Sequence, residues 1–135
     1  MSYWLIKSEP DAYSFTQMLK DKKSDWTGVR NYQAANNLKA MKVGDTCFFY
    51  HSNEGKEIVG TVEVSGTYRP DPTDETNKFG MVVVSKPKAA KNTLTLAAIK
   101  EHTSLKNMAF VKQSRLSVSP VTAAEAKTIL KLLGL

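Results

Sequence analysis

The chain has 135 residues, a hydrophobic content of 41% and a charged content of 24%. These values are typical of a globular protein and favour a single domain, residues 1–135, whose core needs no disulfide or structural metal. No apolar run approaches the roughly 20 residues of a membrane-spanning helix. The opening "MSYWLIKSEP" also lacks the features of a signal peptide. We therefore expect no membrane partner.

The single cysteine, Cys47, excludes an intrachain disulfide and a cysteine-rich metal site. It lies in an apolar run, where a free cysteine usually acts as a small buried hydrophobic residue. This usage fits a reducing, cytoplasmic compartment, and we expect a monomer. The net charge of +6 favours a polyanionic partner such as nucleic acid, although the lysines are scattered along the chain.

The N-terminal third is expected to contain one strand and two short helices. Residues 2–7 read as a strand, which Pro10 ends because proline cannot donate to a ladder. Ser14 and Gln17 have the spacing of a capping box and begin a short helix. Asn31 is expected to cap the second helix, whose apolar face carries Ala34, Leu38 and Met41.

The middle of the chain reads as strands separated by turns. Residues 46–52, "TCFFYHS", are apolar on both faces, which indicates a central strand. Gly55 is available for the hairpin turn that leads into a half-buried strand over residues 56–68. Residues 69–80 contain two prolines and are expected to form a flexible surface loop before a strand at 81–85.

The C-terminal part is expected to end in a well-specified helix. A short helix over residues 93–102 begins near Thr95, and residues 108–121 read as two extended stretches. A capping box at Thr122 then begins the last helix, which Gly134 ends. Five or six strands with short peripheral helices predict an α+β fold built on a small closed or nearly closed β-barrel.

Signatures of catalysis and of cofactor binding are scarce. The sequence has neither a glycine-rich phosphate loop nor the histidine and cysteine spacing of a zinc site, so we expect no cofactor and no metal. His102 is typical of a solvated residue near a helix end. His51 ends an aromatic strand, where it is either a satisfied polar residue or a catalytic one. Glu9 and Asp11 give weak support for a hydrolytic pair.

A binding pocket for a flat ligand is easier to assemble from the sequence. Four aromatic residues stand at the ends of elements or in loops, where ligand-facing residues concentrate: Trp26, Tyr32, His51 and Tyr68. Polar side chains are near them in the sequence: Ser8, Glu9, Arg30, Asn31, Ser52 and Arg115. Apolar walls with a few directed polar groups are what a nucleobase requires. The alternative is that Trp26 closes the core and that the polar residues are ordinary surface.

Several segments together resemble the EVE domain family: "YWLIKSEP" at 3–10, "GVRNYQA" after Trp26, "MKVGD" at 41–45, "FFYHS" at 48–52, "IVG" at 58–60 and "RLSVSPV" at 115–121. The resemblance covers nearly the whole chain and extends more distantly to YTH domains. It implies a PUA-like β-barrel, grouped with modules that bind RNA or modified bases. YTH relatives hold N6-methyladenine in an aromatic cage, and eukaryotic EVE relatives are associated with modified cytosine in DNA.

The resemblance also implies which residues line the base-binding pocket. Trp26 matches the first tryptophan of the cage, and Lys7, Ser8 and Glu9 match the strand end beside it. Asn31 and Tyr32 follow along the rim, and the central strand that faces the pocket ends in Tyr50, His51 and Ser52. Glu9 replaces the amide of YTH domains, and no second tryptophan follows. Tyr68 or Phe79 is therefore the candidate for the second wall.

These observations predict a non-enzymatic module that flips a modified base out of DNA or RNA and holds it against Trp26. The base is expected to be a modified cytosine, because the carboxylate of Glu9 accepts from an exocyclic amino group, with N6-methyladenine as the alternative. Arg30 and Arg115 would contact phosphates or brace the pocket. Two other functions remain open: an enzyme that processes nucleic acid with His51 and Glu9, and an accessory module that binds another protein.

Overall fold

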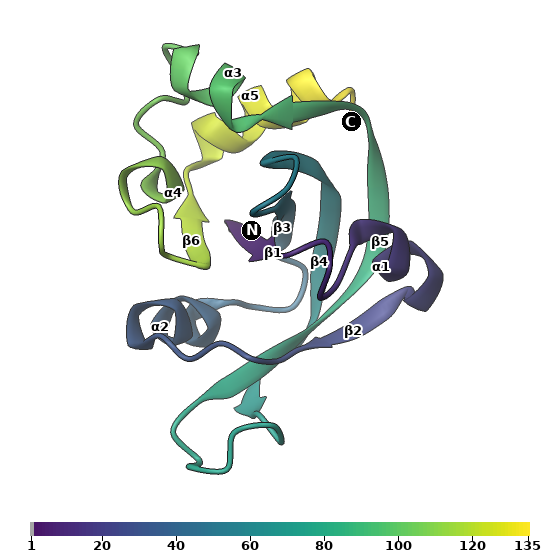
Figure 1. The fold of residues 1–135 in the computed structure, drawn as a ribbon, viewed down its shortest axis with the longest axis vertical. Helices are drawn as coiled ribbons and strands as arrows, with labels where there is room; N and C mark the ends of the chain where they lie inside the picture. The colour runs from purple at the N-terminus through teal and green to yellow at the C-terminus, as the bar shows by residue number, and fades with distance from the viewer. Residues whose placement is uncertain (1) are drawn as a thin grey trace.

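The computed structural model describes residues 2–135, which form six strands and five helices (Figure 1). In chain order these are β1 (Tyr3–Ser8), α1 (Phe15–Asp21), β2 (Lys23–Trp26), α2 (Tyr32–Ala40), β3 (Thr46–His51), β4 (Glu57–Pro70), β5 (Gly80–Thr95), α3 (Leu96–Glu101), α4 (Ala109–Lys112), β6 (Val118–Val121) and α5 (Ala123–Leu133). Of these helices, none is long and apolar enough to cross a membrane.

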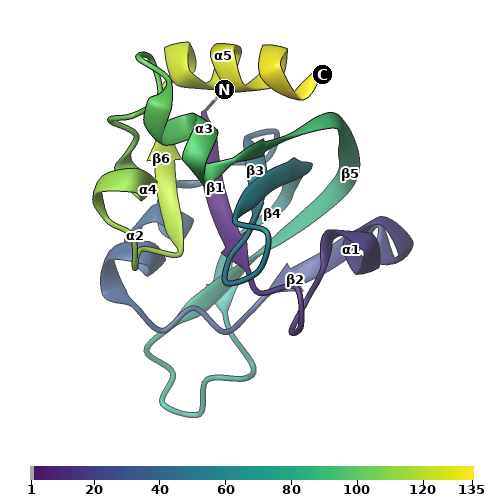
Figure 2. The same cartoon turned by 45° about the horizontal axis from the view of Figure 1, so that its top comes forward.

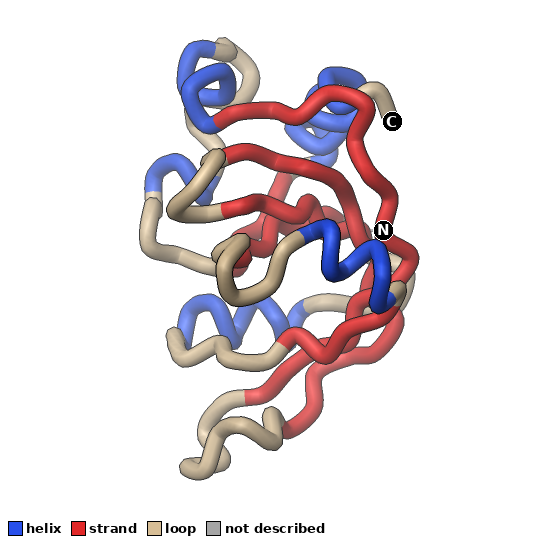
Figure 3. Tube along the Cα trace, turned by 45° about the vertical axis from the view of Figure 1, so that its right-hand side comes forward, coloured by secondary structure: helices blue, strands red, loops and turns tan. Residues whose placement is uncertain are grey.

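All six strands belong to one sheet, in the order β2-β5-β4-β3-β1-β6. β1 and β3 are parallel, and the other neighbours are antiparallel. Register shifts bend the long β4–β5 pair, and Figure 3 shows the strands as one curved layer. The edge strands β2 and β6 do not pair with each other within residues 2–135. The α+β class and the strand number are therefore as predicted, but a closed barrel is not confirmed.

The central strands bury both faces, because successive side chains of a strand point to opposite sides of the sheet. Ile6 and Phe49 belong to one apolar cluster, which α1 and α2 cover. Leu5 and Phe48 belong to a second cluster on the other side, which α5 covers. Figure 2 shows α5 lying across that side, with α3 and α4 near its N-terminal end. The apolar run at residues 46–52 is thus central, as predicted.

Most of the expected helix ends are confirmed. The side chains of Ser14, Asn31, Thr95 and Thr122 each accept a hydrogen bond from the main chain three residues later. At Thr122 both halves of the capping box form, and Gly134 ends the last helix with φ of 76°. At Ser14 only half of the box forms, since the Gln17 side chain donates to Asp21 instead.

Three expectations about the elements are wrong. β2 was not expected, because its sequence KSDW is short and polar, and its pairing with β5 makes it a strand. β5 continues past residue 85 to Thr95, since β4 supplies partners such as Ala89 for Gly60. The first half of the stretch 108–121 is not extended but forms α4, whose Phe110 is buried against the sheet.

Candidate functional site

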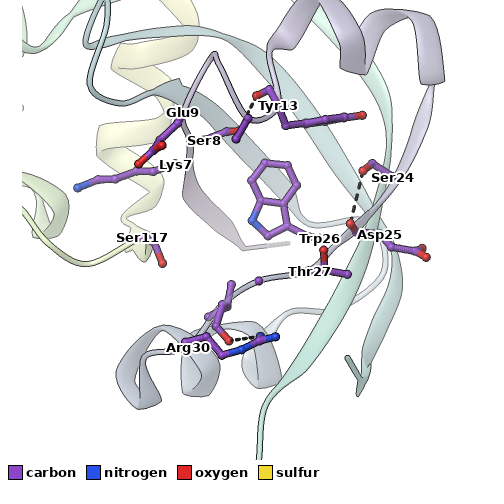
Figure 4. Close-up of a pocket in the computed structure, with 13 residues that line it drawn as sticks. Lys7, Ser8, Glu9, Tyr13, Ser24, Asp25, Trp26, Thr27, Arg30 and Ser117 are labelled. Carbon is purple, nitrogen blue, oxygen red and sulfur yellow. Dashed lines mark hydrogen bonds between the residues drawn. The ribbon is translucent and has the colours of Figure 1, made fainter. Parts of the chain in front are cut away.

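A cavity of about 450 Å³ opens where β1 and β2 end (Figure 4). Its volume is in the range of ~300–1,000 Å³ that is usual for small-molecule sites. Three segments and one further residue line it: Lys7, Ser8 and Glu9 from the end of β1, Ala12 and Tyr13 before α1, residues 24–30 around the end of β2, and Ser117. The curvature of the sheet brings residues 24–30 beside the end of β1, although three strands separate β2 from β1 in the sheet order.

Trp26 is both a core residue and a wall of this cavity. Only 8% of its surface is exposed, and its ring packs edge to face on Phe49 at 5.5 Å and on Tyr13 at 6.3 Å. The indole nevertheless borders the cavity (Figure 4). Trp26 is therefore anchored in the core by its packing on Phe49 and Tyr13, and the rest of its indole borders the cavity.

The indole nitrogen of Trp26 has no hydrogen-bond acceptor among residues 2–135, as Figure 4 also shows for the residues around it. Trp4 provides the contrast, because its Nε1 donates to Asp45 Oδ2 at 3.0 Å inside the core. A buried tryptophan usually finds a partner for its N–H group. The N–H of Trp26 is therefore a free donor at the wall of the cavity.

The end of β1 gives the cavity its polar side. The Ser8 hydroxyl donates to the carbonyl oxygen of Tyr13 at 2.5 Å and holds the turn before α1 in place. Glu9 is exposed, and its carboxylate forms neither an ion pair nor a hydrogen bond within the described chain. Lys7 donates from Nζ to the carbonyl oxygen of Ser114 at 2.7 Å, and burial lowers its pKa. The cavity thus offers a free carboxylate and a free indole N–H.

The opposite side is held by the buried carboxylate of Asp71. It accepts from the main-chain N–H of Gly28 at 2.9 Å, from Arg30 Nη1 at 3.0 Å and from Thr73 N at 2.7 Å and Oγ1 at 2.6 Å. Burial alone would raise the pKa of Asp71, but the hydrogen bonds from Thr73, Gly28 and Arg30 lower it to about 2. Arg30 also donates to Thr73, so its guanidinium braces the lining segment.

Five of the predicted site residues line the cavity: Lys7, Ser8, Glu9, Trp26 and Arg30. Seven do not: Asn31, Tyr32, Tyr50, His51, Ser52, Tyr68 and Arg115. The structure does not place the predicted pocket residues Asn31, Tyr32, Tyr50, His51, Ser52 and Tyr68 at this cavity, and their part in binding, like that of Arg115, stays a prediction.

The packing of β3 explains why Tyr50 and His51 lie away from the cavity. Tyr50 is next to Phe49 in β3, so it points to the opposite face and packs on Phe110. The His51 ring packs on Phe49, and its Nε2 accepts from the main-chain N–H of Phe15 at 3.0 Å. Burial lowers the pKa of His51, with Glu57 opposing the shift.

The remaining aromatic candidates lie elsewhere. Tyr32 is 64% exposed and packs on Phe79 with ring centroids 4.9 Å apart. Tyr68 lies under the ammonium group of Lys39. Asn31 caps α2 and, with Arg115, borders a different cavity between α2 and the loop before β6. Neither Tyr68 nor Phe79 lines the cavity as a second wall.

Several lining residues were not expected from the sequence: Tyr13, Ser24, Asp25, Thr27, Gly28, Val29 and Ser117. The brace at Asp71 was also missed, although the sequence carries a signal for it. "DPTDET" contains two Asp-x-Thr units, and in each the aspartate accepts from the main chain and hydroxyl of the threonine two residues later. This loop was expected to be flexible, yet Asp71 and Asp74 are both buried.

No group of three or more His, Cys, Asp or Glu side chains in residues 2–135 lies close enough to hold a metal ion. Cys47 is buried, and burial raises the pKa of its thiol.

The fold and the cavity define a small α+β domain with an open cavity that Trp26 lines at the ends of β1 and β2. The chain belongs to the EVE domain family, whose sequence model matches residues 2–132. The resemblance noted from the sequence is therefore confirmed.

Three known proteins show how close the similarity is. The Rpa0253 protein of Rhodopseudomonas palustris, solved by NMR, superimposes with a TM-score of 0.93 at 48% identity, covering 99% of this chain and 94% of that one. Human THYN1, solved in complex with DNA containing 5-methylcytosine, superimposes with a TM-score of 0.91 at 32% identity, covering 100% and 99%. Thymocyte nuclear protein 1 of Gallus gallus is 35% identical in an alignment 164 positions long, which covers 96% of this chain and 68% of that protein.

Proposed function

We propose that this protein is a non-enzymatic module that binds nucleic acid and reads a modified base, 5-methylcytosine in the first place, in the cavity beside Trp26. The observation that carries the proposal is the free indole N–H of Trp26 at a cavity that also presents the free carboxylate of Glu9. The human relative solved with DNA containing 5-methylcytosine supports the choice of base. A monomeric, cytoplasmic, single-domain protein is part of this proposal.

The two free groups suit the edge of cytosine. A carboxylate only accepts hydrogen bonds, and the exocyclic amino group of cytosine donates them. An indole N–H only donates, and the carbonyl oxygen of cytosine accepts. Glu9 and Trp26 would therefore hold two different groups of the same base. N6-methyladenine, the alternative ligand, lacks a carbonyl oxygen and would leave the indole N–H with a ring nitrogen as its acceptor.

The free energies of base flipping, aromatic contact and methyl burial determine how strongly 5-methylcytosine should be preferred over cytosine. Flipping a base out of a duplex costs a few kcal/mol, which an aromatic contact of ~1–3 kcal/mol together with hydrogen bonds at the base edge can offset. Burial of the 5-methyl group contributes about 0.8 kcal/mol. Since 1.4 kcal/mol corresponds to a factor of ten, the methyl group alone gives about a fourfold preference over cytosine.

The test is a titration of short fluorescent duplexes that differ only in one base: cytosine, 5-methylcytosine, 5-hydroxymethylcytosine or N6-methyladenine. We expect the 5-methylcytosine duplex to bind best. Trp26→Phe should keep the fold and lose the N–H donor, and Trp26→Ala should lose the aromatic wall as well. Trp4→Phe is the matched control, because Trp4 donates to Asp45 and does not line the cavity.

The proposal fails if folded Trp26→Phe and Trp26→Ala proteins bind all four duplexes as the wild type does. It also fails if Trp4→Phe reduces selectivity as much as Trp26→Phe. Thermal unfolding of each variant by circular dichroism separates a loss of binding from a loss of fold.

The enzymatic alternative has less support from the geometry. His51 does not line the cavity, and its Nε2 lone pair is occupied by the N–H of Phe15. A general base needs a free lone pair within reach of the proton that it removes. Turnover of any of the four duplexes that His51→Ala abolishes would overturn the non-enzymatic assignment.

A further inference from the structure

A second cavity, of about 230 Å³, lies next to the first on the other side of Lys7. It is bordered by the turn between β3 and β4, by α3 and by α4, which lie near one another in Figure 2. The residues that line it are Lys7, Tyr50, Ser52, Asn53, Lys56, Leu96, Lys100, Phe110, Val111 and Ser114. The proposed reading of a base at Trp26 does not use this cavity.

Lys7 is the partition between the two cavities. Within residues 2–135 it is the only residue that lines both of them. Its Nζ donates to the carbonyl oxygen of Ser114 and lies 5.9 Å and 5.7 Å from the ring centroids of Tyr50 and Phe110. Figure 4 shows that this ammonium group points away from the indole of Trp26. Its charge is therefore directed toward the second cavity.

The lining of the second cavity has one sign of charge. Its lining includes three lysines, Lys7, Lys56 and Lys100, and no aspartate or glutamate within the described chain. Ser52, Asn53 and Ser114 add residues whose side chains can donate hydrogen bonds. A lining of cations and donors without a carboxylate suits a phosphate group.

The inner surface of the same cavity is apolar. Tyr50 and Phe110 pack edge to face with centroids 5.2 Å apart, and Leu96 and Val111 complete the surface. Sugars and bases of nucleotides lie well on such surfaces, while their phosphates stay with the cations at the rim. A nucleotide unit therefore fits the cavity better than a free anion does.

We propose that the second cavity binds the phosphate and sugar of the nucleotide that adjoins the base read at Trp26, with Lys56 and Lys100 as the phosphate ligands. This inference rests on the proposed function, because the first cavity must hold the base. Two cavities that share the single wall of Lys7 suit two successive nucleotides of one strand. The contact is independent of sequence, so it raises affinity without changing which base is chosen.

The test uses the double variant Lys56→Gln/Lys100→Gln and the short duplex that carries one 5-methylcytosine. Each phosphate that is no longer neutralised reduces the slope of log affinity against log salt by about 0.9, so the double variant, which loses one phosphate, should lose about 0.9. If the two curves meet near 1 M salt, this corresponds to up to about an eightfold loss of affinity at 0.1 M. The ratio of affinities for 5-methylcytosine and cytosine should not change.

The matched control is Lys127→Gln/Lys131→Gln, which removes the same charge from exposed positions on α5. It should leave the slope nearly as in the wild type. A second arm replaces the phosphates on either side of the methylated base by uncharged methylphosphonates. The wild type should bind this DNA as weakly as the double variant binds ordinary DNA. When the double variant binds the methylphosphonate DNA, the loss of affinity should be no larger than the loss caused by either change alone.

The possible failures are distinguishable. If the double variant behaves like the control on α5 while Trp26→Phe removes selectivity, the second cavity has no phosphate role and the proposed function stands. If the double variant changes the preference for 5-methylcytosine and leaves the salt slope unchanged, the cavity reads a base and the phosphate assignment is wrong. If Trp26→Phe leaves selectivity unchanged, the proposed function itself fails.

Discussion

Asp71→Asn is the substitution that best tests how the cavity is built. The carboxylate is buried and accepts four hydrogen bonds, two of them from Gly28 and Arg30 in the lining segment. An asparagine has nearly the same shape but only one acceptor oxygen and no charge. The substitution therefore breaks the brace between the loop at residues 71–79 and the segment after Trp26 while changing little of the packing.

The expected loss of stability follows from the contacts. Hydrogen bonds to a charged group contribute about 1.5–3 kcal/mol each, and removing one partner of a buried ion pair costs about 3–5 kcal/mol. Because the Arg30 side chain is 39% exposed and recovers some hydration, we take the lower end, about 3 kcal/mol. For a chain of this length the melting temperature should fall by roughly 12 °C.

Asp74→Asn is the control for binding. Asp74 is also buried and also accepts four hydrogen bonds, from Thr76 N and Oγ1, Lys78 N and Phe79 N, and none of these residues lines the cavity. Both variants should unfold earlier in a calorimetric scan. Below their melting temperatures only Asp71→Asn should bind the 5-methylcytosine duplex more weakly. Equal affinities of the two variants would refute the idea that Asp71 shapes the site.

The same residue predicts a pH dependence of stability. The pKa of Asp71 is lowered from 3.8 to about 2 in the folded protein, so the folded state prefers the charged form. Its contribution is complete above about pH 4 and is lost as the pH falls from about 3.8 through about 2. Urea unfolding across this range should show a smaller acid destabilisation in Asp71→Asn than in the wild type. Parallel curves for the two proteins would contradict this.

Two further predictions concern the support of α1. In Gly60→Ala the new Cβ would overlap the Phe15 ring and stand 2.5 Å from the carbonyl oxygen of Lys88. We therefore expect the free energy of unfolding, measured with urea, to fall by about 1–3 kcal/mol. An unchanged midpoint would show that Phe15 can move aside freely. Burial lowers the pKa of His51 below 6.5, and its Nε2 accepts from Phe15. Stability should therefore fall as the pH drops below 6.5, because the unfolded chain takes up a proton that the folded histidine disfavours. An NMR titration with its midpoint at or above 6.5, or an equal pH dependence in His51→Gln, would disprove this.

Local signals in the sequence were sufficient for much of the fold. The caps at Asn31 and Thr122 depend on a hydrogen bond over three residues, so the residue types alone specify them. The central position of β3 follows from a run that is apolar on both faces. The family could also be recognised from the sequence. The resemblance to that family made Trp26 a candidate wall of a pocket, and Trp26 does line the cavity.

The tertiary structure decided which of the predicted site residues line the same cavity. β2 exists because β5 pairs with it, and the brace joins Gly28 to Asp71, which are 43 positions apart. The partition joins Lys7 to Ser114, which are 107 positions apart. Periodicity and capping describe only neighbours along the chain, whereas a cavity is made by segments that the sheet brings together from its two ends. The sequence therefore determined that Trp26 could serve a ligand, and the packing of β1 against β3 and β6 determined which side chains stand beside it.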